Sequence, residues 1–208
     1  MFSIFKKKTV VPHVRLTGII GSAGRFKQGM ELANQRDILQ KAFSLKKISH
    51  VAISINSPGG SVSASNELYN SFLAFKKKSN SSIIFHTSEV LASGGYWSSL
   101  SGERIYASYG SIIGSIGVKG PDWFYFNKPK LISSGFLGQT IEVEKEIEIY
   151  STNAGKSKDL FNSFRKPTKE ELIHLSNMVE IINEDFIQLV SKNRKLEKKI
   201  IKDEIGGL

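Results

Sequence analysis

The sequence predicts a single α/β domain built on a parallel sheet, and two observations, the length and the order of the elements, lead to this prediction. The chain has 208 residues, a length that suits one globular domain with a sizeable core. Short β-branched runs alternate with longer segments of helical periodicity, an order that implies parallel pairing through right-handed crossovers. The chain has no cysteine, which excludes disulfides, thiolate nucleophiles and Cys-ligated metal sites.

The first elements follow from alternation and turn signals. Residues 10–20 alternate apolar with polar side chains and predict a strand. A helical pattern at about 30–46 comes next, and then a β-branched run at 51–55 that suits a buried strand. The run stops at the dense turn signal 56–60, Asn-Ser-Pro-Gly-Gly.

The middle of the chain continues the same order. A helix is predicted at about 61–78, with lysines at its C-terminus, and a short strand at 83–87. A helix rich in small residues opens around 92–97, and a further strand is predicted at 104–107.

The last third is less regular until its end. Residues 112–118 read as a loop or strand, and 121–137 are aromatic and Pro-rich, which fits a substrate groove, a subunit contact or a simple packed insertion. Residues 141–150 predict a half-exposed strand. A long helix is predicted at 168–193 from a capping box and a stripe that is expected to be buried. The stripe consists of Leu172, Leu175, Val179, Ile182, Phe186 and Leu189.

The charge of the chain is strongly basic. Lys and Arg number 29 against 19 Asp and Glu, a net charge of +10, and only six of the basic residues are Arg. Surfaces that read bases or clamp phosphates usually depend on Arg, so we expect mostly solvated surface and no nucleic-acid partner. The second interpretation of this positive charge is attraction to an anionic membrane surface.

The N-terminal residues 1–8 are apolar and then basic, the reverse of the order in a signal peptide. No apolar stretch approaches the roughly 20 residues that a spanning helix requires. We therefore expect a cytoplasmic protein, with peripheral association with the inner membrane left open.

The predicted topology brings two loops together. Parallel strands at 51–55 and 83–87 would place Gly59, Gly60 and Ser93 at the same edge of the sheet, where open α/β folds bind ligands. Glycine amides and a helix N-terminus can stabilise an oxyanion beside a serine nucleophile. Taken separately, the glycines also fit an ordinary turn, and Ser93 an ordinary helix cap.

Three motifs in this order resemble the SppA-type signal peptide peptidases. They are Asn-Ser-Pro-Gly-Gly-Ser-Val at 56–62, Ala-Ser-Gly-Gly-Tyr-Trp at 92–97 and Gly-Ser-Ile-Gly-Val at 114–118. The resemblance covers about 12–195 and implies a peptidase domain with the ClpP/crotonase-type repeated β-β-α spiral. A basic tail, 1–11, would precede it, and a short tail, 196–208, would follow.

The resemblance also implies roles for individual residues. Ser93 would be the nucleophile, and the N–H groups of Gly60 and Gly94 would form the oxyanion hole. No histidine lies between 87 and 173. SppA-type enzymes use a lysine in a Gly-x-x-Lys segment, which matches 155–158 and nominates Lys158 as the base.

Two further residues belong to this assignment. Lys156 is the alternative candidate for the base in place of Lys158. Ser115 resembles the serine that orients the catalytic lysine in the family. A lysine of ordinary pKa, about 10.4, is almost fully protonated at pH 7. A lysine base must therefore be desolvated or lie near other positive charge.

The function implied is that of a serine endopeptidase that cleaves extended peptides, such as signal-peptide remnants or membrane-protein segments, through an acyl-enzyme. The resemblance implies a homo-oligomer and neither a metal nor an organic cofactor. Two alternatives remain: a catalytically silent scaffold, suggested by a short C-terminus, and a crotonase-like acyl-CoA enzyme. The latter would use carboxylates near the glycine loop, where only Glu89 and Glu103 lie close in sequence.

Overall fold

A computed structural model describes residues 10–21, 29–125 and 157–205 of the chain. The predicted strand at 141–150, the lysine Lys156 and much of the stretch 121–137 lie outside these residues. The chain divides into two compact units: one comprises 1–118 and 183–208, and the other 119–182.

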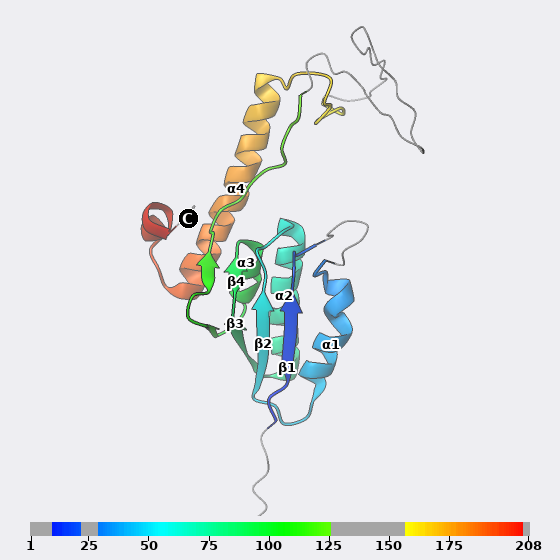
Figure 1. The fold of residues 1–208 in the computed structure, drawn as a ribbon. Helices are drawn as coiled ribbons and strands as arrows, with labels where there is room; N and C mark the ends of the chain where they lie inside the picture. The colour runs from blue at the N-terminus through cyan, green and yellow to red at the C-terminus, as the bar shows by residue number, and fades with distance from the viewer. Residues whose placement is uncertain (1–9, 22–28, 126–156, 206–208) are drawn as a thin grey trace, which may run out of the picture. The chain divides into compact units, whose positions relative to one another are not determined.

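The first unit is built on a four-stranded parallel sheet, as the sequence predicts. The strands are β1 (His13–Thr17), β2 (His50–Asn56), β3 (Ser82–Thr87) and β5 (Arg104–Ala107), in the order β1-β2-β3-β5. Each neighbouring pair is parallel. Figure 1 shows the strands pointing in one direction, so their C-terminal ends share one edge.

Two short strands form a second sheet, separate from the main one. β4 (Val90–Ala92) and β6 (Ile112–Gly114) pair in parallel as a separate sheet. Isolated parallel bridges join Ile20 to Gly60 and Ser57 to Leu91. Each main strand is therefore followed by a short extended segment that leaves the sheet. This is the repeated β-β-α spiral expected for the ClpP/crotonase-type fold.

Three helices follow the expected pattern in the first unit. α1 (Leu32–Ser44), α2 (Val62–Ser79) and α3 (Gly94–Ser99) connect the strands as crossovers. The core lies between helices and sheet: Phe72 of α2 meets Phe85 of β3 edge-on, with ring centroids 5.4 Å apart, and both are fully buried. Burying each such side chain contributes about 1.5–3 kcal/mol.

The long helix α4 (Lys169–Arg194) confirms the predicted capping box. The Glu171 N–H donates to Thr168 Oγ1 at 3.2 Å, and the Thr168 N–H donates to Glu171 Oε2 at 2.9 Å. A short helix α5 (Lys198–Ile200) and a π-helical turn (Ile201–Ile205) follow.

The predicted buried stripe of this helix is wrong at its start. Leu172 is 49% exposed, whereas Phe186, Ile187 and Val190 are buried. The reason is that α4 buries only those apolar side chains that pack against other elements of the first unit. Phe186 packs against Trp97 of α3, with ring centroids 4.8 Å apart, so burial follows that contact and not the stripe along the whole helix.

Candidate active site

Ser93 lies at the turn between β4 and α3, in a strained backbone conformation. Its φ is 51° and its ψ is −122°, a combination that non-glycine residues rarely adopt and that costs about 1–3 kcal/mol. The side chain is half-buried at the first turn of α3. A serine on a tight, strained strand-to-helix turn is the arrangement that presents a nucleophile in α/β hydrolases.

Backbone hydrogen bonds on both sides hold this turn. The Ser93 N–H donates to the Gly114 carbonyl at 2.9 Å, and the Trp97 N–H donates to the Ser93 carbonyl at 2.9 Å. The Ala92 N–H donates to the Ser57 carbonyl at 3.0 Å. The conformation of Ser93 is therefore fixed by β6, by α3 and by the turn after β2.

The Gly59-Gly60 turn touches Ser93 directly. A Cβ added to Gly59 would lie 2.7 Å from the Ser93 Cβ and 2.8 Å from the Gly94 nitrogen, so no larger residue fits without displacing the turn. A Cβ added to Gly94 would lie 3.4 Å from the Gly60 nitrogen. The two predicted oxyanion-hole glycines are thus neighbours.

The direction of the Gly60 amide follows from its bridge to Ile20. This bridge uses the Ile20 N–H, which donates to the Gly59 carbonyl at 2.8 Å, and the Ser61 N–H, which donates to the Ile20 carbonyl at 2.9 Å. Because alternate residues of an extended strand point their amides to opposite edges, the Gly60 N–H points away from Ile20. The Gly94 N–H belongs to the first turn of α3, where amides have no intrahelical acceptor.

Ser115 lies beside Ser93 in register. Ala92 pairs with Gly114 at the ends of β4 and β6, so the next residues of the two strands, Ser93 and Ser115, are adjacent. Ser115 also has a positive φ, 50°, and its side chain is exposed. The structure thus brings Ser93, Gly60, Gly94 and Ser115 together.

Two residues that shape this site were read from the sequence only as parts of a turn. Asn56 Oδ1 accepts hydrogen bonds from Thr87 Oγ1 at 2.8 Å and from the N–H groups of Ser88 and Glu89 at 3.1 Å each. Ser57 Oγ accepts the Gly59 N–H at 3.1 Å. An Asn that caps a neighbouring turn has no periodic signal, so only its place after a buried strand could have indicated it.

Lys158 lies in the other unit. It is exposed and sits in the turn that precedes α4. Its neighbour Asp159 is bound by Arg165: Nε donates to Asp159 Oδ2 at 2.7 Å and Nη2 to Asp159 Oδ1 at 2.9 Å. The same guanidinium donates to both Glu171 oxygens, at 2.8 and 2.7 Å. The structure does not bring Lys158 and Ser93 into one unit.

Arg165 fixes the charge state of this turn. Its hydrogen bonds lower the pKa of Asp159 and, together with the Thr168 N–H, hold the pKa of Glu171 well below its usual range. Trp123 packs over the guanidinium, 5.3 Å from its ring centroid, and its Nε1 donates to the Asn162 carbonyl at 3.1 Å. The start of the aromatic stretch is therefore packed against the turn that carries Lys158.

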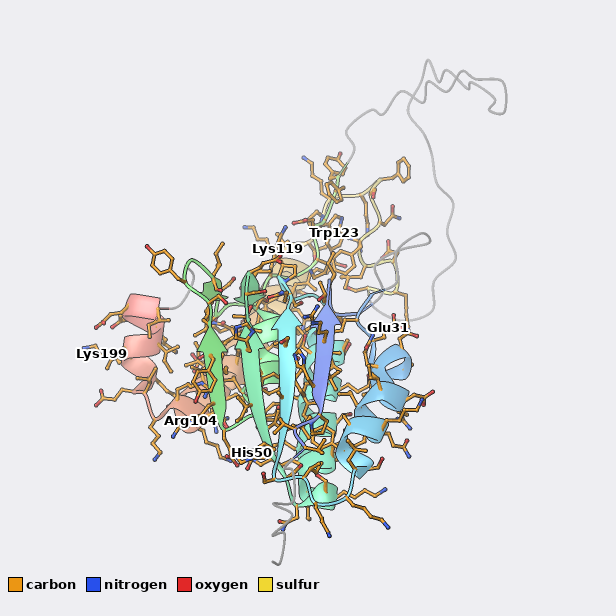
Figure 2. All side chains as sticks on the ribbon, turned by 60° about the horizontal axis from the view of Figure 1, so that its bottom comes forward. Glu31, His50, Arg104, Lys119, Trp123 and Lys199 are labelled. Carbon is orange, nitrogen blue, oxygen red and sulfur yellow. The ribbon has the colours of Figure 1, made fainter. Side chains whose placement is uncertain are left out.

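Three histidines and Glu103 of the first unit have side-chain partners of their own. Within the described residues His13 bonds to Ser54, His50 to Ser49 and His86 to Ser108. Glu103 lies next to Arg104, where β5 begins; Figure 2 labels Arg104 and His50 at that edge. Ser82 and Lys76 bind Glu103 and lower its pKa. Glu103 therefore lies at the edge opposite the glycine turn and cannot serve an acyl-CoA site there.

The described part of the chain contains neither a cluster of metal-ligating side chains nor a membrane-spanning helix. No group of His, Asp and Glu residues is placed to hold a metal ion there. None of the helices described combines the length and the hydropathy that crossing a bilayer needs.

Comparison with known proteins gives relatives but no match to a family model. The chain is 33% identical over 188 residues to a Na(+)/H(+) antiporter NhaA of Brucella melitensis, covering 90% of this chain and 24% of that protein. It is 32% identical over 163 residues to a protein assigned as a protease in Methanocaldococcus jannaschii, covering 78% of this chain and 47% of that one.

A third relative carries a more specific name. A protein of Enterococcus faecium assigned as a signal peptide peptidase SppA is 27% identical over 169 residues, 81% of this chain and 45% of that one. This chain thus spans between a quarter and a half of these three relatives. Among solved structures, a variant of ClpP1 from Listeria monocytogenes aligns over 93% of this chain and 78% of that one, with 14% identity and a TM-score of 0.48.

Proposed function

We propose that this chain, which is related in sequence to the SppA-type peptidases, is a serine endopeptidase with Ser93 as its nucleophile. The observation that carries the proposal is the backbone of Ser93, held at φ 51° and ψ −122° between β4 and α3. Strain of this kind persists only where the surroundings impose it, and it gathers at catalytic positions.

The amides beside Ser93 supply the second part of the mechanism. Ser93 Oγ attacks the carbonyl carbon of a peptide, and the negative charge that develops on the oxygen is stabilised by the N–H groups of Gly60 and Gly94. A well-placed donor of this kind is worth about 3–4 kcal/mol in the transition state. Collapse of the tetrahedral intermediate expels the amine and leaves an acyl-enzyme, which water then hydrolyses.

Lys158 is the proposed general base. As the neutral amine it accepts the proton of Ser93 Oγ and passes it to the leaving amine, while Ser115 orients it. The match of 155–158 to the family's Gly-x-x-Lys segment supports this choice. Because Lys158 is exposed in the turn before α4, the role requires that substrate or a neighbouring chain desolvate it.

The substrates proposed are extended peptides such as signal-peptide remnants or membrane-protein segments. The name of the Enterococcus faecium relative supports this class. We also propose that residues 12–195 form the peptidase domain, that the protein acts as a homo-oligomer, and that it is cytoplasmic, with peripheral contact to the inner membrane. Neither a metal nor an organic cofactor takes part.

Hydrolysis of a set of fluorogenic extended peptides tests the function and the base together. Ser93→Ala is expected to abolish turnover, whereas Ser49→Ala, at an exposed serine just before β2, leaves it within about twofold. Lys158→Ala is expected to lower kcat by about 10²–10⁴-fold, while Lys156→Ala does not. Full activity in Ser93→Ala would refute the proposal, and full activity in Lys158→Ala would refute the base assignment alone.

A further inference from the structure

A pocket outside the catalytic edge lies between α1 and α2. Its volume is about 590 Å³, within the range of pockets that hold small organic ligands. Figure 1 shows the two helices next to each other, and they are joined by Phe43 and Phe75, whose rings stack with centroids 5.3 Å apart. These two rings, together with Leu32, give the pocket an aromatic and aliphatic floor.

The charge of the pocket is of one sign. Arg36, Lys46 and Lys78 line it, and no acidic side chain does. All three cations are exposed, and none forms an ion pair within residues 10–21, 29–125 and 157–205. A lysine at or just past the end of a helix suits the helix dipole, which accounts for Lys46 and Lys78 and leaves Arg36 unexplained. Phe43 belongs to the hydrophobic core and Phe75 packs against it, so the floor of the pocket is the outer edge of that core.

The apolar floor and the three cations together indicate what kind of ligand the pocket binds. α1 and α2 both run against the parallel strands, so they end on the same side of the unit, which brings Lys46 and Lys78 to one end of the pocket. Arg36 lies two turns before the end of α1, about 12 Å from Ser44 at 1.5 Å per residue. A narrow apolar body with an anionic head at the Lys46 and Lys78 end satisfies both features.

We propose that this pocket binds a single-chain anionic amphiphile, a fatty-acid-like molecule whose chain lies on Phe43 and Phe75 and whose head pairs with Lys46 and Lys78. The apolar contact supplies affinity by removing methylene groups from water, and the cations decide the sign of the head group. The site is separate from Ser93 and does not depend on the peptidase assignment.

Calorimetric titration of the whole chain with dodecanoate below its micellar concentration tests the proposal. The matched probe is dodecyltrimethylammonium, which has the same chain and the opposite charge, and it is expected to bind at least tenfold more weakly. Ala74→Trp places a ring in the pocket from an exposed position of α2 and is expected to weaken dodecanoate binding at least tenfold. The control Asn66→Trp is at an exposed position of α2 that does not line the pocket, and it should stay within twofold.

A charge reversal keeps the test independent of the tryptophan variant. Lys78→Glu is expected to lose at least tenfold in affinity, while Lys77→Glu, an adjacent exposed lysine that does not line the pocket, loses no more than about twofold. Equal binding of the two probes, unchanged binding in Ala74→Trp and Lys78→Glu, or no dodecanoate binding by folded protein would each overturn the proposal.

Discussion

At the scale of single residues, the site depends on backbone positions more than on side-chain partners. Ser93 keeps a strained φ of 51° because β6, α3 and the turn after β2 each hold one of its neighbouring backbone groups. Gly59 meets it so closely that a single added carbon would overlap the Ser93 Cβ at 2.7 Å. The chemistry proposed for Ser93 is therefore sensitive to changes in residues that never touch a substrate.

Gly59→Ala tests this closeness. The added methyl group is expected to displace Ser93 and lower kcat/KM by roughly 10²-fold, since small misplacements of a reacting group cost about that much. Gly110→Ala is the matched control: Gly110 also has a positive φ, 83°, but a Cβ there has nothing within 4 Å. Peptide hydrolysis and thermal unfolding of both variants separate the clash from the φ strain. Equal losses in the two variants would contradict the account.

At the scale of elements, side chains at the strand ends hold the turns that build the site. Asn56, the last residue of β2, makes four hydrogen bonds to Thr87, Ser88 and Glu89, at the end of β3 and in the turn that follows. In the second unit, Arg165 joins Asp159 in the turn to Glu171 in the first turn of α4. Each is one polar side chain that fixes a connection between elements.

Asn56→Ala is expected to lower the free energy of unfolding by about 1–3 kcal/mol, because the buried Thr87 hydroxyl loses its acceptor. Asn56→Asp keeps the acceptor oxygen and should lose less than half as much. Urea unfolding at neutral pH measures both. An equal loss in the two variants would contradict the role of the Oδ1 acceptor and would point instead to the Asn56 amide Nδ2, which donates to Ser88 Oγ at 3.0 Å.

Arg165→Met is expected to lower stability in a way that depends on pH. Arg165 lowers the pKa of Asp159 and Glu171. The stabilisation is therefore complete above their unfolded pKa values, about 3.9 and 4.3, and is lost as pH falls through the folded values. The urea concentration at half unfolding is expected to be lower in the variant than in the wild type at pH 7, and this difference should shrink as the pH falls towards 2.

Trp123 reports on this turn, since it lies over Arg165. Its fluorescence is isolated in a Trp97→Phe background, which keeps a ring against Phe186 and is used for the reference protein and for the variants alike. Lys119→Gln, which breaks the exposed pair with Asp122, is the control and should shift the midpoint little. If the difference in urea midpoint between the wild type and Arg165→Met does not change with pH, the ion-pair account is contradicted.

Most elements could be predicted because they carry a periodic pattern or an end signal. α2 is an example, with Ser61 at its start and three lysines at its end. β4 could not be predicted, because three residues are too few to show alternation. The burial of α4 was predicted only in part, since packing in the first unit covers Ile187 and Val190 while Leu172 stays exposed.

At the scale of the whole molecule, the residues nominated from the sequence fall in two units: Ser93, Gly60, Gly94 and Ser115 in the first and Lys158 in the second. The predicted topology put Gly60 and Ser93 at one edge of the sheet, whereas Gly94 and Ser115 came from the family resemblance. The fold brings Ser93 and Ser115 together because β4 and β6 end in register. The partner lysine depended on family resemblance, since an exposed lysine in a turn has no local signature. Three of the basic residues that give the chain its positive charge, Arg36, Lys46 and Lys78, line the α1–α2 pocket.

The second unit leaves apolar side chains on α4 exposed, which fits the proposed homo-oligomer. These are Leu172, Ile173, Met178 and Ile181, exposed by 49, 60, 47 and 63%. Ile173→Glu with Ile181→Glu, eight residues apart and so on one face, is expected to reduce the molar mass seen by light scattering to that of the monomer. Ser176→Glu is the control. An unchanged oligomer in the double variant, or a monomeric wild type, would contradict this prediction.

The central claim is that Ser93 is the nucleophile, and the most direct test is to map the adduct of a fluorophosphonate on the folded protein. Tandem mass spectrometry is expected to place the phosphonyl group on Ser93 Oγ, with labelling lost in Ser93→Ala and kept in Ser49→Ala. An adduct on another serine, or no adduct on protein that circular dichroism shows to be folded, would contradict the claim.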